Sequence, residues 1–169
     1  MHITFTTGDV DAALDIMREA GQWQIDQGCE LWLMNTLTRE YIQNPPEEFL
    51  VAWAQASEKF EPAACCLLSY QDPIFWPDVP AGTSGFLHKV AVRRKFARQG
   101  IPARLIQHAE QLCREKNITT LRLDTDFDRP KLRALYERLG FMPVGTRVLR
   151  LAELNMEEIE VVLFEKTLI

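Results

Sequence analysis

The stretch from Phe86 to Cys113 constrains the fold more than any other part of this sequence. Its first part, Phe86 to Val92, is rich in apolar residues and predicts a strand. A short basic loop follows, and Ile101 to Cys113 then carries apolar residues at the spacing of one helix face. A strand, a short loop and an amphipathic helix in this order are typical of α/β proteins, in which helices cover a sheet.

The rest of the chain continues this mixture of strands and helices. Further strands are expected at Ile3–Thr6, Phe49–Gln55, Ala63–Tyr70, Thr119–Leu123, Phe141–Leu149 and Ile159–Leu168. Further helices are expected after Asp9, over Leu31–Ile42 with Pro45-Pro46 as its stop, and after Asp128, which we expect to cap the last helix. We therefore predict a single α/β domain over residues 1–169, with a mixed central sheet of about six to seven strands flanked by about four helices.

Composition excludes several classes of function. The formal net charge is −5, so no global attraction to nucleic-acid phosphates is expected. No apolar run approaches the roughly 18 residues that a membrane span needs. The start of the chain, Met1 to Thr4, lacks the basic and apolar regions of a secretory signal. We expect a cytoplasmic protein that binds neither nucleic acid nor membrane.

The positions of cysteine and histidine argue against a metal site. The four cysteines include no C-x-x-C pair, and the three histidines are scattered along the chain. Reduced thiols are the expected state of cysteines in a cytosolic protein. We therefore predict no bound metal.

Basic residues are concentrated between Lys89 and Arg104. This window contains six Lys or Arg residues and no Asp or Glu, although the chain as a whole is acidic. It spans the end of a strand, a loop with Gly100 and the start of a helix, where unpaired backbone N–H groups and the helix dipole favour anions. Glycine also lets the backbone approach a bulky ligand closely. The window is predicted to bind phosphate, and the alternative is a solvated basic surface without a ligand.

Three segments resemble the GNAT superfamily of N-acetyltransferases. The acetyl-CoA motif of that family is a strand followed by [Arg/Gln]-x-x-Gly-x-[Gly/Ala] at the start of a helix, and residues 90–106 resemble it with V-A-V-R-R-K-F-A-R-Q-G-I-P-A-R-L-I. Residues 132–141, L-R-A-L-Y-E-R-L-G-F, resemble its A-x-x-L-Y-x-K-x-G-F segment. Residues 159–168 resemble its closing strand. The resemblance implies a GNAT-like fold whose CoA-binding half lies at about residues 86–141.

The resemblance also implies an activity, namely transfer of an acetyl group from acetyl-CoA to a primary amine of a small molecule or peptide by direct attack of the amine. It places these residues at the cofactor: Val90, Ala91, Val92, Ala97, Arg98, Gln99, Gly100, Ile101, Pro102, Ala103 and Arg129. Ala97 stands where the family usually has Arg or Gln, and Pro102 stands where it usually has Gly or Ala. One cation and one backbone N–H are therefore absent. Arg98 lies next to the missing cation and is expected to replace it.

Candidate catalytic residues come from two parts of the sequence. Tyr136 occupies the tyrosine position of the second motif, which implies that it donates a proton to the departing thiolate; the alternative is a core aromatic residue. His88 is a candidate general base, because it lies on the strand expected to line the acetyl group and histidine changes charge near neutral pH. Asp72, Asp124 and Asp126 are alternatives to His88, and so is a relay through water.

Recognition of the amine is expected outside the cofactor motif. The loop over residues 71–85 is long and rich in Pro and Gly, as functional loops often are. Asp72 and Trp76 are its candidate substrate contacts, because carboxylates and aromatic faces suit a cationic amine. In the structural alternative, the loop is a surface excursion pinned to the core by its aromatic residues.

A different class of function keeps the fold and discards catalysis. In this alternative the chain is an acyl-CoA-binding sensor or regulatory module, which the departures at Ala97 and Pro102 favour and the retention of Tyr136 disfavours. The resemblance also allows a homodimer through the C-terminal strands.

Overall fold

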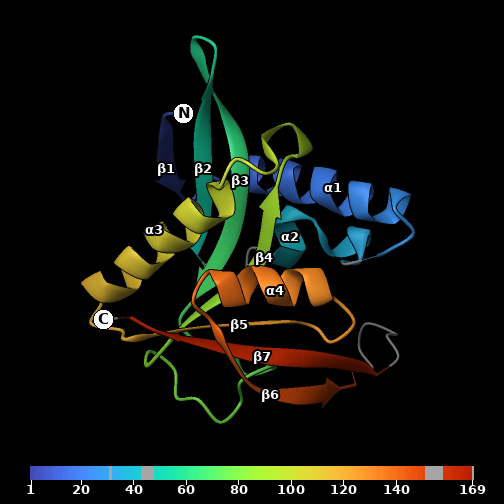
Figure 1. The fold of residues 1–169 in the computed structure, drawn as a ribbon, viewed down its shortest axis with the longest axis vertical. Coiled ribbons are helices and arrows are strands. Elements are labelled where there is room, and N and C mark those ends of the chain that lie inside the picture. Colours follow the sequence, from blue (N-terminus) through green and yellow to red (C-terminus); the bar gives the residue numbers. More distant parts are fainter. Residues whose placement is uncertain (31, 43–47, 151–157, 169) are drawn as a thin grey trace. The chain divides into compact units, whose positions relative to one another are not determined.

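The computed structural model describes residues 1–30, 32–42, 48–150 and 158–168. Within these ranges seven strands form one mixed sheet in the order β1-β2-β3-β4-β5-β7-β6, together with four α-helices (Figure 1). The strands are β1 (Ile3–Thr7), β2 (Glu48–Ala56), β3 (Lys59–Ser69), β4 (Gly85–Val92), β5 (Thr120–Asp126), β6 (Met142–Leu149) and β7 (Ile159–Thr167). The helices are α1 (Val10–Asp26), α2 (Arg39–Ile42), α3 (Ile101–Glu115) and α4 (Pro130–Arg138), with short 3₁₀ helices η1 (Met34–Thr36) and η2 (Arg94–Phe96). The predicted α/β fold is confirmed.

Contacts divide the chain into two compact units. The first unit comprises Met1–Ser69 and His88–Leu112, and the second comprises Tyr70–Leu87 and the chain from Cys113 onward. The chain passes from one unit to the other at three points, which lie at the end of β3, within β4 and within α3. None of the helices in the described ranges is long and apolar enough to cross a membrane.

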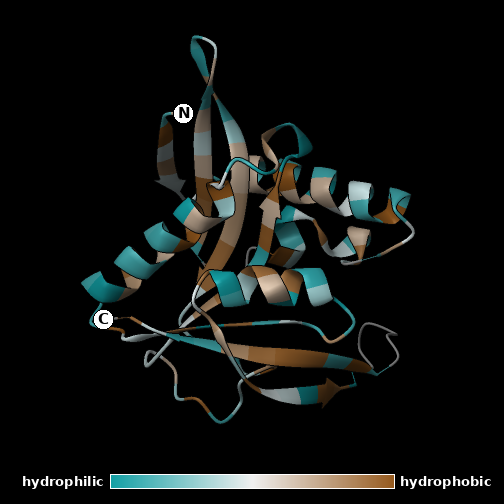
Figure 2. Cartoon of the chain, viewed as in Figure 1, coloured by the Kyte–Doolittle hydropathy of each residue, from teal (hydrophilic) through white to brown (hydrophobic). Residues whose placement is uncertain are grey.

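The first unit is built on the antiparallel strands β1, β2 and β3. On one face, Met17 of α1 belongs to a core cluster with Val51 of β2. The other face meets α3, where the His108 ring stacks on Phe5 at a centroid distance of 4.5 Å. Phe5 pairs with Ala52, and successive strand residues point to opposite faces. The two helices therefore bury opposite faces of the same strands, and the visible surface of α3 is largely hydrophilic (Figure 2).

The second unit is built on β5, which pairs in parallel with β4 and antiparallel with β7, while β7 also pairs with β6. One face of these strands carries Phe86 and Leu163, which form a core cluster with Trp76 from the loop between β3 and β4. On the other face, the Tyr136 ring of α4 packs against Phe164 at a centroid distance of 6.1 Å. Each face of this unit is thus covered by one segment.

The N-terminal helix begins where the sequence predicts it. Asp9 is the residue before α1, and its Oδ1 accepts a hydrogen bond from the backbone N–H of Ala12 at 3.2 Å. This bond satisfies one of the N–H groups that a helix start leaves unpaired.

The single helix predicted over Leu31–Ile42 is wrong. The described part of this segment forms η1 and α2 instead, and Leu37 between them has φ −85° and ψ 61°, which is outside the helical region. Leu37 is 1% exposed in the core cluster against α1, and the Met34 sulfur lies only 2.7 Å from where a Cβ on Gly21 would be. Packing on α1 therefore decides the local conformation. Leu31 and the predicted stop at Pro45-Pro46 lie outside the described residues.

The prediction that Asp128 caps the last helix is also wrong. Arg129 is the residue before α4, with φ −116° and ψ 65°, and it makes no side-chain capping bond. Pro130 is the cause, because the ring of a proline disfavours helical backbone at the preceding residue. The helix therefore begins at Pro130, where a missing N–H costs no helix hydrogen bond.

Candidate functional site

The loop between β4 and α3 contains two left-handed residues. Ala97 has extended backbone, Arg98 then has φ 62° and Gly100 has φ 73°, and α3 begins at the next residue. Nothing lies within 4 Å of the position that a Cβ on Gly100 would take. Glycine here therefore supplies the left-handed backbone and leaves open space beside the start of a helix. We call residues 97–103 the phosphate loop.

The first turn of α3 follows this open space. The backbone N–H of Arg104 bonds to the Gly100 carbonyl at 3.4 Å, which leaves the amides before it as the helix-start donors. Pro102 contributes no N–H, so Ile101 and Ala103 are the residues of this turn whose amides can meet an anion. The arrangement fits a phosphate group, with one donor fewer than a turn without proline.

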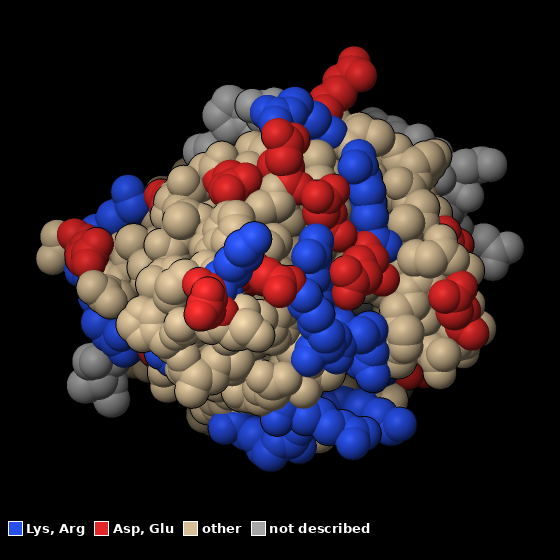
Figure 3. All heavy atoms as spheres, turned by 90° about the horizontal axis from the view of Figure 1, so that it is seen from above, with Lys and Arg blue, Asp and Glu red and all other residues tan. Residues whose placement is uncertain are grey.

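Most of the basic residues in the window 89–104 have partners within the chain. Arg93 Nε lies 3.2 Å from the Glu19 carboxylate, and Lys95 pairs with Glu61. The other contacts are Arg94 over the Trp23 ring at 3.9 Å, Lys89 over the Trp32 ring at 5.5 Å and Arg104 Nη1 to the Met1 carbonyl at 3.3 Å. On the face drawn in Figure 3, acidic side chains likewise lie beside the basic ones.

Arg98 differs from the other five. It is exposed, and in the described part of the chain it has no ion pair, hydrogen bond or ring contact. The sequence predicts one phosphate-binding cluster that contains all six bases. Contacts within the chain account for five of these bases, and Arg98 is the cation available to a ligand at the phosphate loop.

The strand before the loop has an unusual backbone. The parallel ladder with β5 joins Gly85–Leu87 to Leu121–Leu123, and β4 continues past it to Val92. Within this extension, Lys89 has φ 50°, a conformation that a non-glycine residue holds only when its surroundings enforce it. No sequence pattern marks this kink.

The three predicted cofactor residues Val90, Ala91 and Val92 follow the kink directly. Ala91 is 4% exposed and its side chain belongs to the core cluster of the first unit. A ligand beside this part of β4 would therefore meet the backbone of Ala91, while its side chain serves the core.

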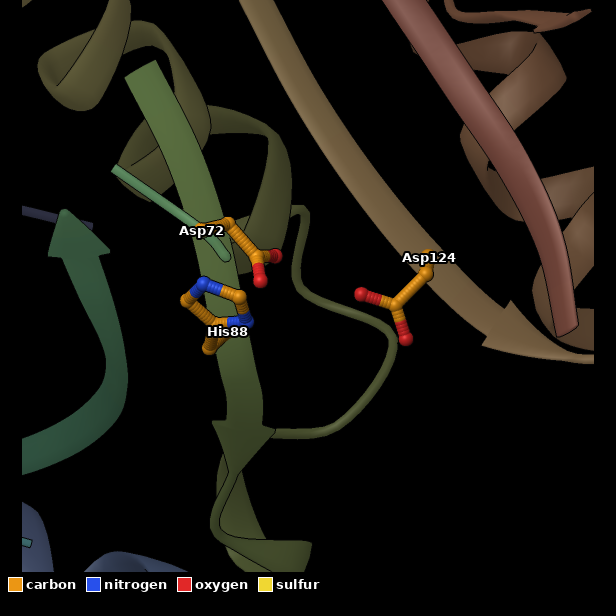
Figure 4. Close-up of side chains that lie close together, drawn as sticks. All are labelled: Asp72, His88 and Asp124. Atoms are coloured by element: carbon orange, nitrogen blue, oxygen red, sulfur yellow. The ribbon is translucent and has the colours of Figure 1, made fainter. Parts of the chain in front are cut away.

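Three of the four candidate bases lie together. The potential ligand or proton-accepting atoms of Asp72, His88 and Asp124 lie within 4.8 Å of one another, and Figure 4 shows their side chains converging. The ladder between β4 and β5 ends at the pair Leu87 and Leu123, and His88 and Asp124 are the next residues of the two strands. We call these three residues the acid–histidine cluster. Asp126, the fourth candidate, instead lies 3.4 Å from Arg129 Nε.

Asp72 also organises the backbone of its loop. Its Oδ1 accepts hydrogen bonds from the backbone N–H groups of Ile74 at 3.1 Å and Phe75 at 2.9 Å. The residue is 6% exposed, so one carboxylate oxygen is committed to this turn while the group as a whole faces the cluster. An Asp or Asn side chain holds such turns well.

The surroundings of Trp76 match the structural alternative. The side chain is 6% exposed, its ring lies 6.4 Å from Phe86, and the Arg122 guanidinium lies 4.9 Å from its ring. Arg122 also pairs with Glu165 at 3.0 Å. Sequence reasoning did not select Arg122, since nothing in its local pattern shows that a loop residue will stack on it. A substrate contact for Trp76 stays a prediction.

Tyr136 and Arg129 both belong to α4 and its start. Tyr136 is 7% exposed, and its ring packs against Phe141 and Phe164 with centroid distances of 6.0 and 6.1 Å. The ring is therefore packed as a core aromatic residue would be. Proton donation by the Tyr136 hydroxyl stays a prediction. The cofactor role of Arg129, whose Nε approaches Asp126, is likewise a prediction.

Comparison with known proteins identifies the family. The profile of the Acetyltransferase (GNAT) family matches residues 12–141, well over half of the chain. The chain belongs to the GNAT acetyltransferase family. Membership makes this GNAT protein an acetyl-CoA-dependent acyltransferase, and the family and the acyl donor predicted from its motifs are confirmed.

Individual relatives agree with this assignment. The GNAT protein is 27% identical over 142 residues to the uncharacterized N-acetyltransferase YesJ of Bacillus subtilis (strain 168), a match that covers 81% of this chain and 78% of the relative. It superposes on the ribosomal-protein-S18-alanine N-acetyltransferase from Escherichia coli with a TM-score of 0.66, 18% identity and coverage of 99% and 94% of the two chains. A GNAT family acetyltransferase from Elizabethkingia anophelis with acetyl-CoA bound gives a TM-score of 0.65, with 18% identity and 98% of both chains covered. At these identities the superpositions establish the fold.

Replacement of Arg98 by Ala should weaken acetyl-CoA binding about ten- to a hundredfold at low ionic strength, because a charge-assisted hydrogen bond contributes about 1.5–3 kcal/mol. The difference should narrow as salt screens the charge. Isothermal titration at two ionic strengths measures both effects. The matched control is Lys59→Ala, which removes an exposed cation at the start of β3 and should leave the Kd unchanged. An Arg98→Ala protein with the wild-type Kd at low salt would remove Arg98 from the site.

Proposed function

We propose that this GNAT protein transfers the acetyl group of acetyl-CoA to a primary amine of a small molecule or peptide, by direct attack of the amine. The observation that carries the amine part of this proposal is the acid–histidine cluster (Figure 4). Two carboxylates beside an imidazole attract a cationic amine and offer it a proton acceptor. Both properties are needed, since an amine is charged at neutral pH and must lose a proton before it can attack.

The phosphate loop supports the donor side of the proposal. Acetyl-CoA supplies an activated acyl carbon and a thiol leaving group. Arg98 and the amides at the start of α3 would hold its pyrophosphate, and the open space beside Gly100 would receive it. The backbone of Val90–Val92, just past the kink at Lys89, would hold the adjoining part of the cofactor and orient it for attack.

Proton transfers to and from the protein accompany the exchange of bonds. A bond forms between the amine nitrogen and the acetyl carbon, and the bond between that carbon and sulfur breaks. His88 accepts the proton that the amine loses, with Asp72 and Asp124 stabilising the charged imidazole. Tyr136 supplies the proton that the departing sulfur gains, and a second proton that the nitrogen loses as the amide forms restores the Tyr136 hydroxyl. Of the two protons that the charged amine loses, the one taken up by His88 before attack is then released to solvent. Because Tyr136 is held by aromatic neighbours on two sides, its hydroxyl has a defined position.

Buried cysteines favour direct transfer over an acyl-cysteine route. Cys65, Cys66 and Cys113 are buried, and none of the four cysteines forms a disulfide. Burial raises the pKa of the Cys65 and Cys66 thiols well above the usual range, so these groups stay neutral and poorly nucleophilic. Reduced thiols also agree with the cytoplasmic location that we propose. A homodimer stays a prediction from the family resemblance.

The second candidate function is a sensor that binds acyl-CoA without turnover. The observation that favours it is the incomplete phosphate site, in which Ala97 provides no cation and Pro102 no amide. The acid–histidine cluster favours catalysis, because a binding module has no use for a proton acceptor beside the acyl group.

Turnover across a panel of amines separates the two functions. The purified protein should release free CoA from acetyl-CoA when at least one class of amine is present. The classes to test are amino acids, polyamines, aminoglycosides and peptides with a free N-terminal amine. Thiol release is followed with a chromogenic disulfide, and the acetylated amine is identified by mass. Binding of acetyl-CoA in the micromolar range without transfer to any class would favour the sensor. Absence of binding at millimolar acetyl-CoA would overturn both functions.

Replacement of Tyr136 by Phe should lower kcat about 100-fold, the size expected for loss of a general acid. The Kd for acetyl-CoA should stay within about twofold, because the ring contacts with Phe141 and Phe164 are retained. Steady-state kinetics and isothermal titration measure the two quantities. A wild-type kcat would assign Tyr136 to the core alone.

Replacement of His88 by Gln should lower kcat/KM about 100-fold and abolish the acidic limb of its pH profile, since the base must be unprotonated to act. Asp72→Asn should reduce the rate less, because the amide oxygen still accepts from Ile74 and Phe75 while the negative charge is lost. Asp78→Asn is the control, as Asp78 lies in the same loop, is exposed and pairs with Arg147 outside the cluster. A His88→Gln profile with an unchanged acidic limb would exclude His88 as the base.

A further inference from the structure

Two side chains of α1 contact the residues that join β4 to the phosphate loop. The Glu19 carboxylate lies 3.2 Å from Arg93 Nε and accepts a hydrogen bond from the backbone N–H of Arg94 at 3.3 Å. Four residues further along α1, the Trp23 ring lies 3.9 Å from the Arg94 guanidinium carbon. Residues four apart share one face of a helix. One face of α1 therefore contacts the consecutive residues Arg93 and Arg94, and we call Glu19 and Trp23 the α1 clamp.

The clamped residues determine where the phosphate loop starts. The backbone N–H of Arg93 also bonds to the Ala63 carbonyl of β3 at 2.9 Å, so Arg93 is held from the sheet and from α1. The short helix η2 begins at the next residue and leads directly into the loop. The loop then contains the left-handed residues Arg98 and Gly100. Such conformations persist when the surrounding structure over-determines them.

Charge and position act in opposite directions at Glu19. A carboxylate near a phosphate site repels the ligand, and it also neutralises Arg93, which could otherwise attract it. Electrostatics alone would make Glu19 unfavourable for binding an anion. Its contacts with Arg93 and Arg94 would favour binding only by preorganising the loop. A preorganised loop loses less conformational entropy when the ligand binds.

We propose that Glu19 and Trp23 are positioning residues for the acyl donor, which act by holding Arg93 and Arg94 so that the phosphate loop is preorganised for the pyrophosphate of CoA. This inference rests on the proposed donor site. It extends that site to a helix of the N-terminal half, which the cofactor motif does not include.

The deciding experiment compares acetyl-CoA binding to the wild-type, Glu19→Ala and Glu19→Gln proteins by isothermal titration. Glu19→Ala should raise the Kd about fivefold, as expected for the loss of one hydrogen bond and one ion pair. Glu19→Gln should recover most of this loss, because its amide oxygen can still accept from Arg94 N–H. If charge dominates instead, both variants should bind more tightly than wild type, and the inference would be overturned.

Kinetics and a matched control exclude a general loss of stability. In Glu19→Ala and in Trp23→Leu, the KM for acetyl-CoA should rise, while kcat at saturating acetyl-CoA and the KM for the amine stay unchanged. Asp11→Ala removes another acid of α1, whose partner is the exposed Arg39, and should change none of these values. An equal rise of KM in Asp11→Ala would assign the effect to α1 as a whole and overturn the clamp.

The failure of this inference differs from the failure of the proposed function. A wild-type protein that does not bind acetyl-CoA would overturn the donor site and the clamp together. A wild-type protein that binds acetyl-CoA, with Glu19→Ala and Trp23→Leu binding equally well, would overturn the clamp and leave the donor site intact.

Discussion

The path of β4 is the constraint on which the remaining features of the site depend. Its ladder with β5 comprises three residue pairs, and His88 is the first residue beyond it. Lys89, the next residue of the strand, has left-handed backbone, and Arg93 leads into η2 and the phosphate loop. In the proposed donor site the acyl donor contacts the backbone of this region, which leaves the side chains of the same strand for other tasks. Ala91 fills the core, while His88 joins two carboxylates.

The positive charge that a ligand can meet depends more on which bases already have partners than on how many bases the sequence contains. The window 89–104 carries six bases in a chain of net charge −5, yet Glu19, Glu61 and two tryptophans engage four of them. Pairing of this kind fixes the backbone that carries the bases, at the expense of free positive charge. Arg98 is the exception within the described chain, and it stands beside the position where the family motif has its cation. A basic run in sequence therefore overstates the charge that a phosphate ligand meets.

Much of the fold could be predicted from sequence, because its elements are marked locally. The cap at Asp9 and the apolar spacing of α3 place those helices correctly. Two predictions failed, one because of packing against another helix and one because of a proline nearby in the sequence. Leu37 breaks a helical segment because its side chain packs against α1, and Pro130 moves the start of α4 past Asp128 because it disfavours helical backbone before it. Local capping rules cannot predict the break at Leu37, and they predict the start of α4 only when the effect of Pro130 on the preceding residue is included.

What the sequence alone determined is the chemistry available: the glycine at position 100, the cation at position 98, the tyrosine at position 136 and the family to which these residues point. It proposed four candidate bases without a way to choose among them. The tertiary structure grouped Asp72, His88 and Asp124, because these three residues lie apart in the chain and only strand register and loop path bring their side chains together. Asp126 instead lies beside Arg129, three residues further along the chain. The tertiary structure also decides the left-handed backbone of Lys89 and the contacts of Glu19 with Arg93 and Arg94. Their physical origin is contact across many residues, which a local pattern cannot encode.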